Sequence, residues 1–262
     1  MKVTTMSDTL KALNRERYAR AAEKYVASAV HATGMGLPRM LELAEMQADW
    51  QVLDIATGGG HTAYHFAPHV DTVIASDFTE RMAQSAQNFV REQGVNNILF
   101  CGADAEILPF ASNSFDLVTC RVAAHHFPNI PAFIREAYRV LKTDAVLIVH
   151  DHVVPNNKKM ANYVNAYEKL RDPAHARALP EYEWRNIFVK SGLTVEHMEQ
   201  FTIEHDILPW AKRQNCSDET IDQLNLLLQR APDKVLEWMQ PQHLNTEFAR
   251  YTDHHIIIKG RK

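Results

Sequence analysis

The chain has 262 residues, of which 46% are hydrophobic and 23% are charged, and its formal net charge is −4. This composition is typical of a globular protein with a sizeable core, and the scattered Lys and Arg residues form no basic stripe that would bind nucleic acid. No apolar run is long enough to span a membrane, the first residues lack a signal-peptide pattern, and the three cysteines are dispersed, so we expect a cytoplasmic protein with reduced thiols.

Strand and helix patterns alternate in the middle of the chain. Strands are predicted at 50–56, 71–77, 96–104, 114–121 and 145–151, with helices at 61–69, 79–94 and 130–142. Such alternation indicates an α/β fold, a doubly wound parallel sheet with helices on both faces. Ligands bind such sheets beyond the carboxyl ends of the strands, which directs attention to the residues there.

The pattern differs on either side of this region. The first 45 residues are predicted to form helices that pack onto the sheet. After residue 152 we predict helical segments at 156–192 and 207–240, and strands at 193–205 and 251–260. We therefore divide the chain into three parts, residues 1–45, 46–152 and 153–262.

A glycine-rich turn follows the first strand in VLDIATGGGHTA, residues 52–63. Its small residues and the free N–H groups of the next helix suit an anion. The spacing Gly58-x-Gly60-x-x-Ala63 fits a dinucleotide, so an NAD(P)-dependent oxidoreductase is one interpretation. Asp54 favours another, because its carboxylate would repel a pyrophosphate and attract an ammonium group such as that of S-adenosylmethionine. Alternatively, Asp54 only caps the turn.

Two more carboxylates end the next strands. Asp77 is placed to accept hydrogen bonds from ribose hydroxyls, which NAD would offer equally well. Asp104 is placed to accept from an adenine amino group, or else it simply forms a turn. Together the three carboxylates indicate a nucleoside ligand.

The stretches VLDIATGGGHTA, VIASDFTERM, GADAEILPF, SFDLVTCRVAAHHFPN and EAYRVLKTDA occur in the order and spacing of the class I S-adenosylmethionine-dependent methyltransferases. Over roughly residues 15–152 the chain resembles the small-molecule branch that includes the ubiquinone/menaquinone C-methyltransferases and uncharacterised bacterial relatives. The resemblance implies a seven-stranded Rossmann-like sheet with a helical cap, S-adenosylmethionine as cofactor, and a small-molecule methyl acceptor. A protein that binds the cofactor without catalysis remains a further alternative.

The resemblance also implies roles for individual residues. Asp54 and the backbone from Thr57 through Gly58 to Gly60 would hold the methionine part, and Asp77 the ribose. The other implied cofactor contacts are Phe78, Met82, Asp104 and Ala105 at the adenine, the Arg121 carbonyl at the amino group, and Tyr18 and Tyr25 on a covering helix. Ala56 replaces the family's first motif glycine, which we expect to be tolerated if the backbone there keeps a negative φ.

Methyl transfer to a phenol, an enol or a protonated amine needs a base, and histidines stand at two strand ends. His125 and His126 follow the fourth strand and His152 the fifth, so these three are the candidate catalytic residues, with a scaffold role as the alternative. Arg171 and His175, in RDPAHAR, are candidates for binding an anionic substrate group, or else they form a salt-bridged surface.

We predict no metal site. His61, His65 and His69 recur every four residues, but Pro68 should end the helix before the last of them and no further ligand completes the set. The pair at 254–255 begins the last strand, where neighbouring side chains point in opposite directions, and we expect no site there.

Overall fold

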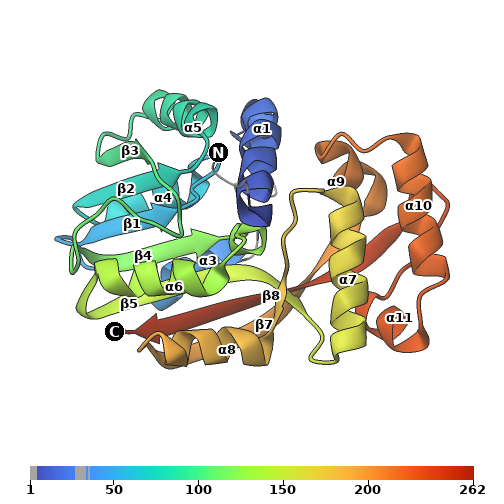
Figure 1. The fold of residues 1–262 in the computed structure, drawn as a ribbon. Helices are drawn as coiled ribbons and strands as arrows, with labels where there is room; N and C mark the ends of the chain where they lie inside the picture. The colour runs from blue at the N-terminus through green and yellow to red at the C-terminus, as the bar shows by residue number, and fades with distance from the viewer. Residues whose placement is uncertain (1–4, 27–33, 35) are drawn as a thin grey trace.

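The computed structural model describes residues 5–26, 34 and 36–262. Its centre is a twisted sheet in the order β3-β2-β1-β4-β5-β8-β7, and the two-residue strand β6 pairs with the end of β5 (Figure 1). The strands are β1 (Gln51–Ile55), β2 (Thr72–Asp77), β3 (Ile98–Gly102), β4 (Phe115–Arg121), β5 (Leu141–Val154), β6 (Leu179–Pro180), β7 (Thr194–Asp206) and β8 (Arg250–Arg261). The seven-stranded path confirms the predicted fold class.

The strand directions determine at which edge of the sheet a ligand site is expected. β1 to β5 run parallel, and β8 is antiparallel to both β5 and β7. The carboxyl ends of β1, β2, β3 and β4 therefore meet at one edge, next to the last residues of β5. The segment 142–145 belongs to the first residues of β5, at the opposite end of the strand from this edge, and the Asp144 N–H donates to the Lys262 carbonyl.

Two apolar layers cover the sheet because each flanking helix turns one hydrophobic face toward it. Phe133, Trp184 and Phe188 belong to one buried cluster, and Met40 and Phe66 to the other. The helices are α3 (Gly36–Ala44), α4 (His61–Phe66), α5 (Glu80–Glu92), α6 (Ile130–Val140) and α8 (Glu181–Lys190), with 3-10 turns η1 (Ala67–His69) and η2 (Ala124–His126). α4 ends before Pro68, as expected.

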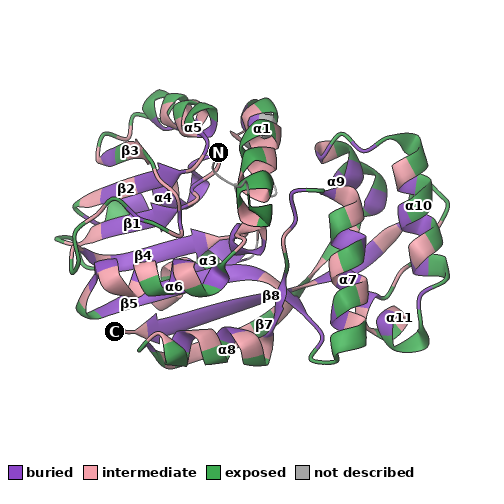
Figure 2. Ribbon diagram, in the orientation of Figure 1, coloured by how far each residue is buried: buried purple, intermediate pink, exposed green. Residues whose placement is uncertain are grey.

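A helical lobe stands beside the sheet, and β7 and β8 extend into it (Figure 1). A third buried cluster, which includes Tyr167, Trp210 and Tyr251, holds its elements together. They are α7 (Lys158–Arg171), α9 (Ile207–Arg213), α10 (Asp218–Gln229) and α11 (Asp233–Met239), whose outer faces are exposed (Figure 2). α1 (Met6–Val26) lies between the sheet and this lobe (Figure 1). Within the described ranges, no helix is long and apolar enough to cross a membrane.

Candidate active site

The turn after β1 is built from left-handed backbone. Gly58 has φ 56° and Gly60 has φ 81°, which glycine adopts without steric cost. Ala56 also lies in this region, at φ 53°, so the negative φ on which its easy tolerance depended is not found. The left-handed conformation costs a residue with a Cβ roughly 1–2 kcal/mol. Ala56 is therefore strained at a position where it lines the cavity. The backbone at Gly58 borders open space, because a Cβ built there would meet nothing within 4 Å.

Asp54 lies beneath this turn. Its Oδ2 accepts from Thr57 Oγ1 at 2.6 Å and its Oδ1 from Thr119 Oγ1 at 2.8 Å, and the residue is only 1% exposed. Burial raises the pKa of this carboxyl to about 6, although the two hydroxyls oppose the shift. The carboxylate therefore braces the turn from below, as the capping alternative predicted, and does not line the cavity.

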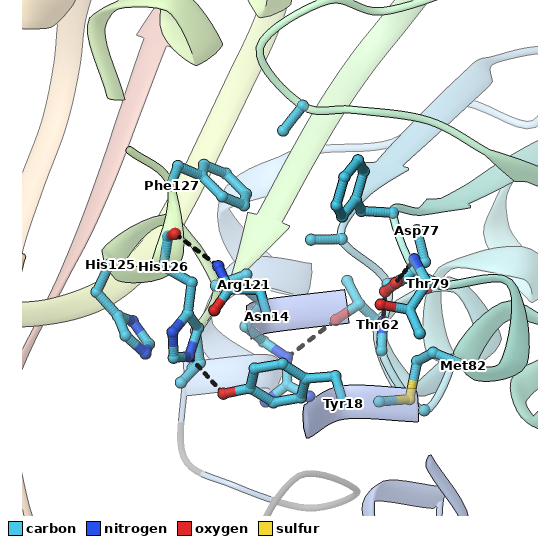
Figure 3. A pocket seen from close by; sticks show the side chains of 18 of the residues that line it. Asn14, Tyr18, Thr62, Asp77, Thr79, Met82, Arg121, His125, His126 and Phe127 are labelled. Atoms are coloured by element: carbon cyan, nitrogen blue, oxygen red, sulfur yellow. Dashed lines mark hydrogen bonds between the residues drawn. The ribbon is translucent and has the colours of Figure 1, made fainter. Parts of the chain in front are cut away.

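Asp77 ends β2 at the cavity wall. Its Oδ2 accepts from the Gly58 N–H at 3.0 Å and its Oδ1 from the Thr79 N–H at 2.8 Å, which fixes the carboxylate between two turns. Burial raises its pKa to about 6 despite these two donors. Phe78 and Met82 line the cavity on the same side, and Figure 3 shows Met82 beside Thr79 and Asp77.

Asp104 and Ala105 line the cavity beyond β3. The Asp104 carboxylate is paired with Lys11 of α1 at 2.7 Å, and Lys11 also reaches Glu106 at 2.6 Å. These ion pairs tie α1 to the strand-end loops. An adenine amino group would share Asp104 with the Lys11 ammonium.

Arg121 ends β4 and connects the two sides of the cavity. Its Nε donates to Thr62 Oγ1 at 2.9 Å (Figure 3). Burial lowers the pKa of its guanidinium to about 10, and the nearby Asp54 opposes that shift. Its backbone pairs with His150 of β5, so the end of β4 is held in register with the next strand.

One cavity runs from the glycine turn to a group of histidines. The predicted residues that line it are Tyr18, Ala56, Thr57, Gly58, Asp77, Phe78, Met82, Asp104, Ala105, Arg121, His125, His126, His152 and Arg171. Asp54, Gly60 and His175 lie outside its lining. The side chain of Tyr25 lies outside the described residues. In Figure 3, Asp77 and Met82 stand on one side and His125 and His126 on the other.

His125 is bonded to a buried carboxylate. Its Nδ1 lies 2.5 Å from Asp151 Oδ1, and its backbone N–H donates to Asp151 Oδ2 at 2.9 Å. Burial, followed by the neighbouring His126 and His152, lowers the pKa of the His125 ring well below its usual value. With Nδ1 turned to Asp151, Nε2 is the ring nitrogen available to accept a proton.

His126 connects α1 to the loop after α7. Its Nε2 lies 2.7 Å from the Tyr18 hydroxyl (Figure 3). That hydroxyl also lies 2.9 Å from Asp172 Oδ2, and Nδ1 of His126 lies 3.1 Å from the Ala174 carbonyl oxygen. Both ring nitrogens are thus occupied by protein groups. This arrangement favours the scaffold role for His126.

The far end of the cavity contains histidines that were not among the three candidate catalytic residues. His150, His205 and His255 line it together with His152. Of the pair at 254–255, where we expected no site, His255 lines the cavity, whereas His254 points elsewhere and reaches the Trp238 carbonyl. Burial opposes protonation of His152, but Asp253 outweighs it and raises the pKa of His152 to about 9.

The two residues predicted to bind substrate, Arg171 and His175, differ in their position relative to the cavity. Arg171 lines the cavity, with its guanidinium carbon 4.4 Å from the centre of the Trp210 ring and its Nε donating to the Trp210 carbonyl. His175 is buried behind His125 and hydrogen bonds Asn165, so the structure does not support direct substrate contact for it. It serves instead as packing behind His125.

A doubly wound sheet with carboxylates at successive strand ends and a glycine turn defines a Rossmann-like, nucleoside-binding protein. A family model described as a methyltransferase domain matches residues 53–149. The uncharacterized methyltransferase YcgJ of Bacillus subtilis is 36% identical over 222 residues, which cover 85% of this chain and 88% of YcgJ. The crystal structure of YcgJ superposes with a TM-score of 0.85 over 88% of this chain and 99% of that chain.

A further relative matches the core alone. The ubiquinone/menaquinone biosynthesis C-methyltransferase UbiE of Pseudomonas putida is 37% identical over 131 residues, 48% of this chain and 51% of UbiE. The chain belongs to the methyltransferase family, and it is an S-adenosylmethionine-dependent methyltransferase. These matches favour neither an NAD(P)-dependent oxidoreductase nor a non-catalytic binder.

Proposed function

We propose that the protein binds S-adenosylmethionine along the ends of β1 to β4 and transfers its methyl group to a small molecule held among the histidines. The observation that carries this proposal is the continuity of the cavity, which joins the Asp77 end to the His125 end without a wall between them. The cytoplasm is the compartment proposed for this reaction, and neither nucleic acid nor a membrane is the proposed partner.

The cofactor would lie with its methionine part over the backbone from Ala56 to Gly58, where the left-handed turn leaves open space. Asp77 would accept a hydrogen bond from the ribose hydroxyls, since its two oxygens offer about four acceptor positions and Gly58 and Thr79 do not use all of them. Phe78 and Met82 would contact the adenine ring, and Asp104 and Ala105 its edge. Asp54 and Gly60 would not contact the cofactor; they would fix the conformation of the turn that binds it.

The three parts of the chain would have different roles in binding the cofactor and the acceptor. Of residues 1–45, α1 would close over the cofactor, with Tyr18 and Lys11 as its anchors, whereas α3 packs on the sheet; residues 46–152 would hold the cofactor. Residues 153–262 would enclose the acceptor, and the Arg171 guanidinium beside Trp210 would suit an acceptor that carries an aromatic or anionic group.

His125 is the proposed general base. When bound, the cofactor supplies an electrophilic methyl group, so the protein has to align the acceptor, exclude water and take up a proton. The neutral His125 ring can accept that proton at Nε2, and the buried Asp151 would stabilise the resulting imidazolium. His152 would contribute to binding the acceptor.

Calorimetric titration with S-adenosylhomocysteine tests cofactor placement. Because Asp77→Asn removes a charged acceptor, we expect the affinity to fall by about 10- to 100-fold. Asp71→Asn is the matched control, because Asp71 precedes β2 at the opposite end of the strand and bonds Gln51 and Thr72 on the surface. Equal affinities of the Asp77→Asn variant and the wild type would refute the proposed site.

A further inference from the structure

Three histidine side chains converge on one oxygen of a buried carboxylate at the end of the cavity far from the glycine turn. Asp253 Oδ2 lies 2.8 Å from His152 Nδ1, 3.1 Å from His255 Nε2 and 3.5 Å from His205 Nε2. Asp253 is 7% exposed and His255 is 3% exposed. The negative charge of this carboxylate is balanced when one of these histidines is protonated, and a bound metal ion could take the place of that proton.

The spacing of these atoms fits ligands around an ion as well as it fits hydrogen bonds. Two ligands about 2.1 Å from a metal lie about 3.0 Å apart when they subtend a right angle. The separations from Asp253 to His152 and His255 agree with this value, and the three ligand atoms all lie within 4.8 Å of one another. Moreover, the buried Nδ1 of His152 has no aligned hydrogen-bond partner among the described residues, although Asp253 is close to it.

A second group of the same composition, His125, Asp151 and His152, is less suited to an ion. Asp151 already accepts from the backbone N–H groups of His125 and His152, at 2.9 and 2.7 Å, as well as from the His125 ring. The contacts that the structure gives the Asp253 carboxylate come from histidine rings. Asp253 therefore retains the lone pairs that a metal would use.

His255 is also braced in the manner of a metal ligand. Its Nδ1 lies 3.0 Å from His150 Nε2, so His255 can donate Nδ1–H to His150 and present the Nε2 lone pair to an ion. His150 is itself fixed, because a Cβ on Gly36 would lie 2.2 Å from its ring. Phe201 stacks against His255 on β8.

We propose that His152, Asp253 and His255 bind a divalent first-row transition-metal ion, with His205 beside it. His152 and His255 line the cavity, so the open coordination positions would face the space proposed for the acceptor. Two histidines and one carboxylate on one side of an ion leave room for exogenous ligands. If the proposed function holds, the ion would bind an oxygen donor of the acceptor, such as a phenolate, enolate or carboxylate, near His125.

Metal binding is tested on untagged, chelator-treated protein with Zn²⁺ as the probe, by competition with a chromophoric chelator and by elemental analysis. We expect stoichiometric Zn²⁺ in the wild type and affinities lower by more than about 100-fold in Asp253→Asn and in His255→Gln. His254→Gln, which alters the next histidine on β8 outside the cluster, should bind like the wild type.

Thermal unfolding and S-adenosylhomocysteine titration of the same samples separate the possible failures. Zn²⁺ should raise the unfolding temperature of the wild type and of His254→Gln but not of the two cluster variants. If the wild type binds no Zn²⁺, or if both cluster variants retain its affinity, the cluster is a hydrogen-bonded network and the metal proposal is wrong. Intact S-adenosylhomocysteine binding in that case would leave the proposed function standing. Should Asp253→Asn fail to fold, His255→Gln and His152→Gln decide the question.

Discussion

The two ends of the cavity are assembled in different ways. The proposed cofactor end is built mainly from one stretch of the chain, residues 56–105, in which each turn follows the strand before it, and α1 residues such as Lys11 and Tyr18 cover it. The histidine end collects single residues from η2, β5, β7 and β8, and the β5–β8 ladder places His152 opposite His255. A motif therefore determines the first end, whereas strand order and register determine the second.

The largest effect should separate the two ends functionally. His125→Gln removes the proposed base, so we expect methyl transfer to fall by about 100-fold or more while S-adenosylhomocysteine affinity stays unchanged. The rate is measured as S-adenosylhomocysteine release with fractionated small-molecule extracts as the acceptor source. His65→Gln on α4 is the control and should react at the wild-type rate. If His125→Gln weakened cofactor binding to the same degree, the two ends would not be distinct.

A smaller effect, at the proposed cofactor end, depends on pH. Because burial raises the pKa of Asp77 to about 6, its carboxylate gains a proton below that pH and loses its charge as an acceptor. S-adenosylhomocysteine affinity should therefore fall as pH decreases, by up to about tenfold between pH 6 and pH 5. Titrations across this range should show the dependence in the wild type and in Asp54→Asn but not in Asp77→Asn. A dependence that survives Asp77→Asn would assign it to another group.

The smallest effect concerns the strained turn. Ala56→Gly relieves a left-handed alanine, so the free energy of unfolding should rise by about 1 kcal/mol. Ala63→Gly, in α4 of the same motif, should lower it by about 1 kcal/mol or more, because glycine is unfavourable within a helix. Denaturant unfolding measures both values. A destabilised Ala56→Gly variant would show that the Ala56 methyl group is needed for packing.

The sequence predicted the sheet well because each buried strand from 50 to 151 is a short apolar run followed by turn residues. It also identified most residues that line the proposed cofactor end. It did not predict the φ of Ala56, since a tight turn overrode the preference of alanine. It placed Asp54 at the ligand, whereas Thr57 and Thr119 hold its carboxylate below the turn.

The histidine end was less accessible to sequence reasoning. His125, His126 and His152 stood out because they follow predicted strands, but His205 and Asp253 lie in strands whose pairing the sequence does not specify. The alternation of Asp253 and His255 on β8 was the signal that could have placed both on one face. His175 was misplaced because the loop after α7 turns it behind His125.

The long strands have a mechanical consequence. β8 pairs with β5 from His255 to Arg261 and with β7 from Arg250 to Arg261. One continuous ladder of backbone hydrogen bonds therefore joins the sheet to the helical lobe. Bending between them would break several backbone hydrogen bonds at once. α1, by contrast, is tied to the strand-end loops through side chains such as Lys11 and Asn14. We therefore expect bound molecules to exchange with solvent past α1, while the two regions that the ladder connects keep a fixed alignment.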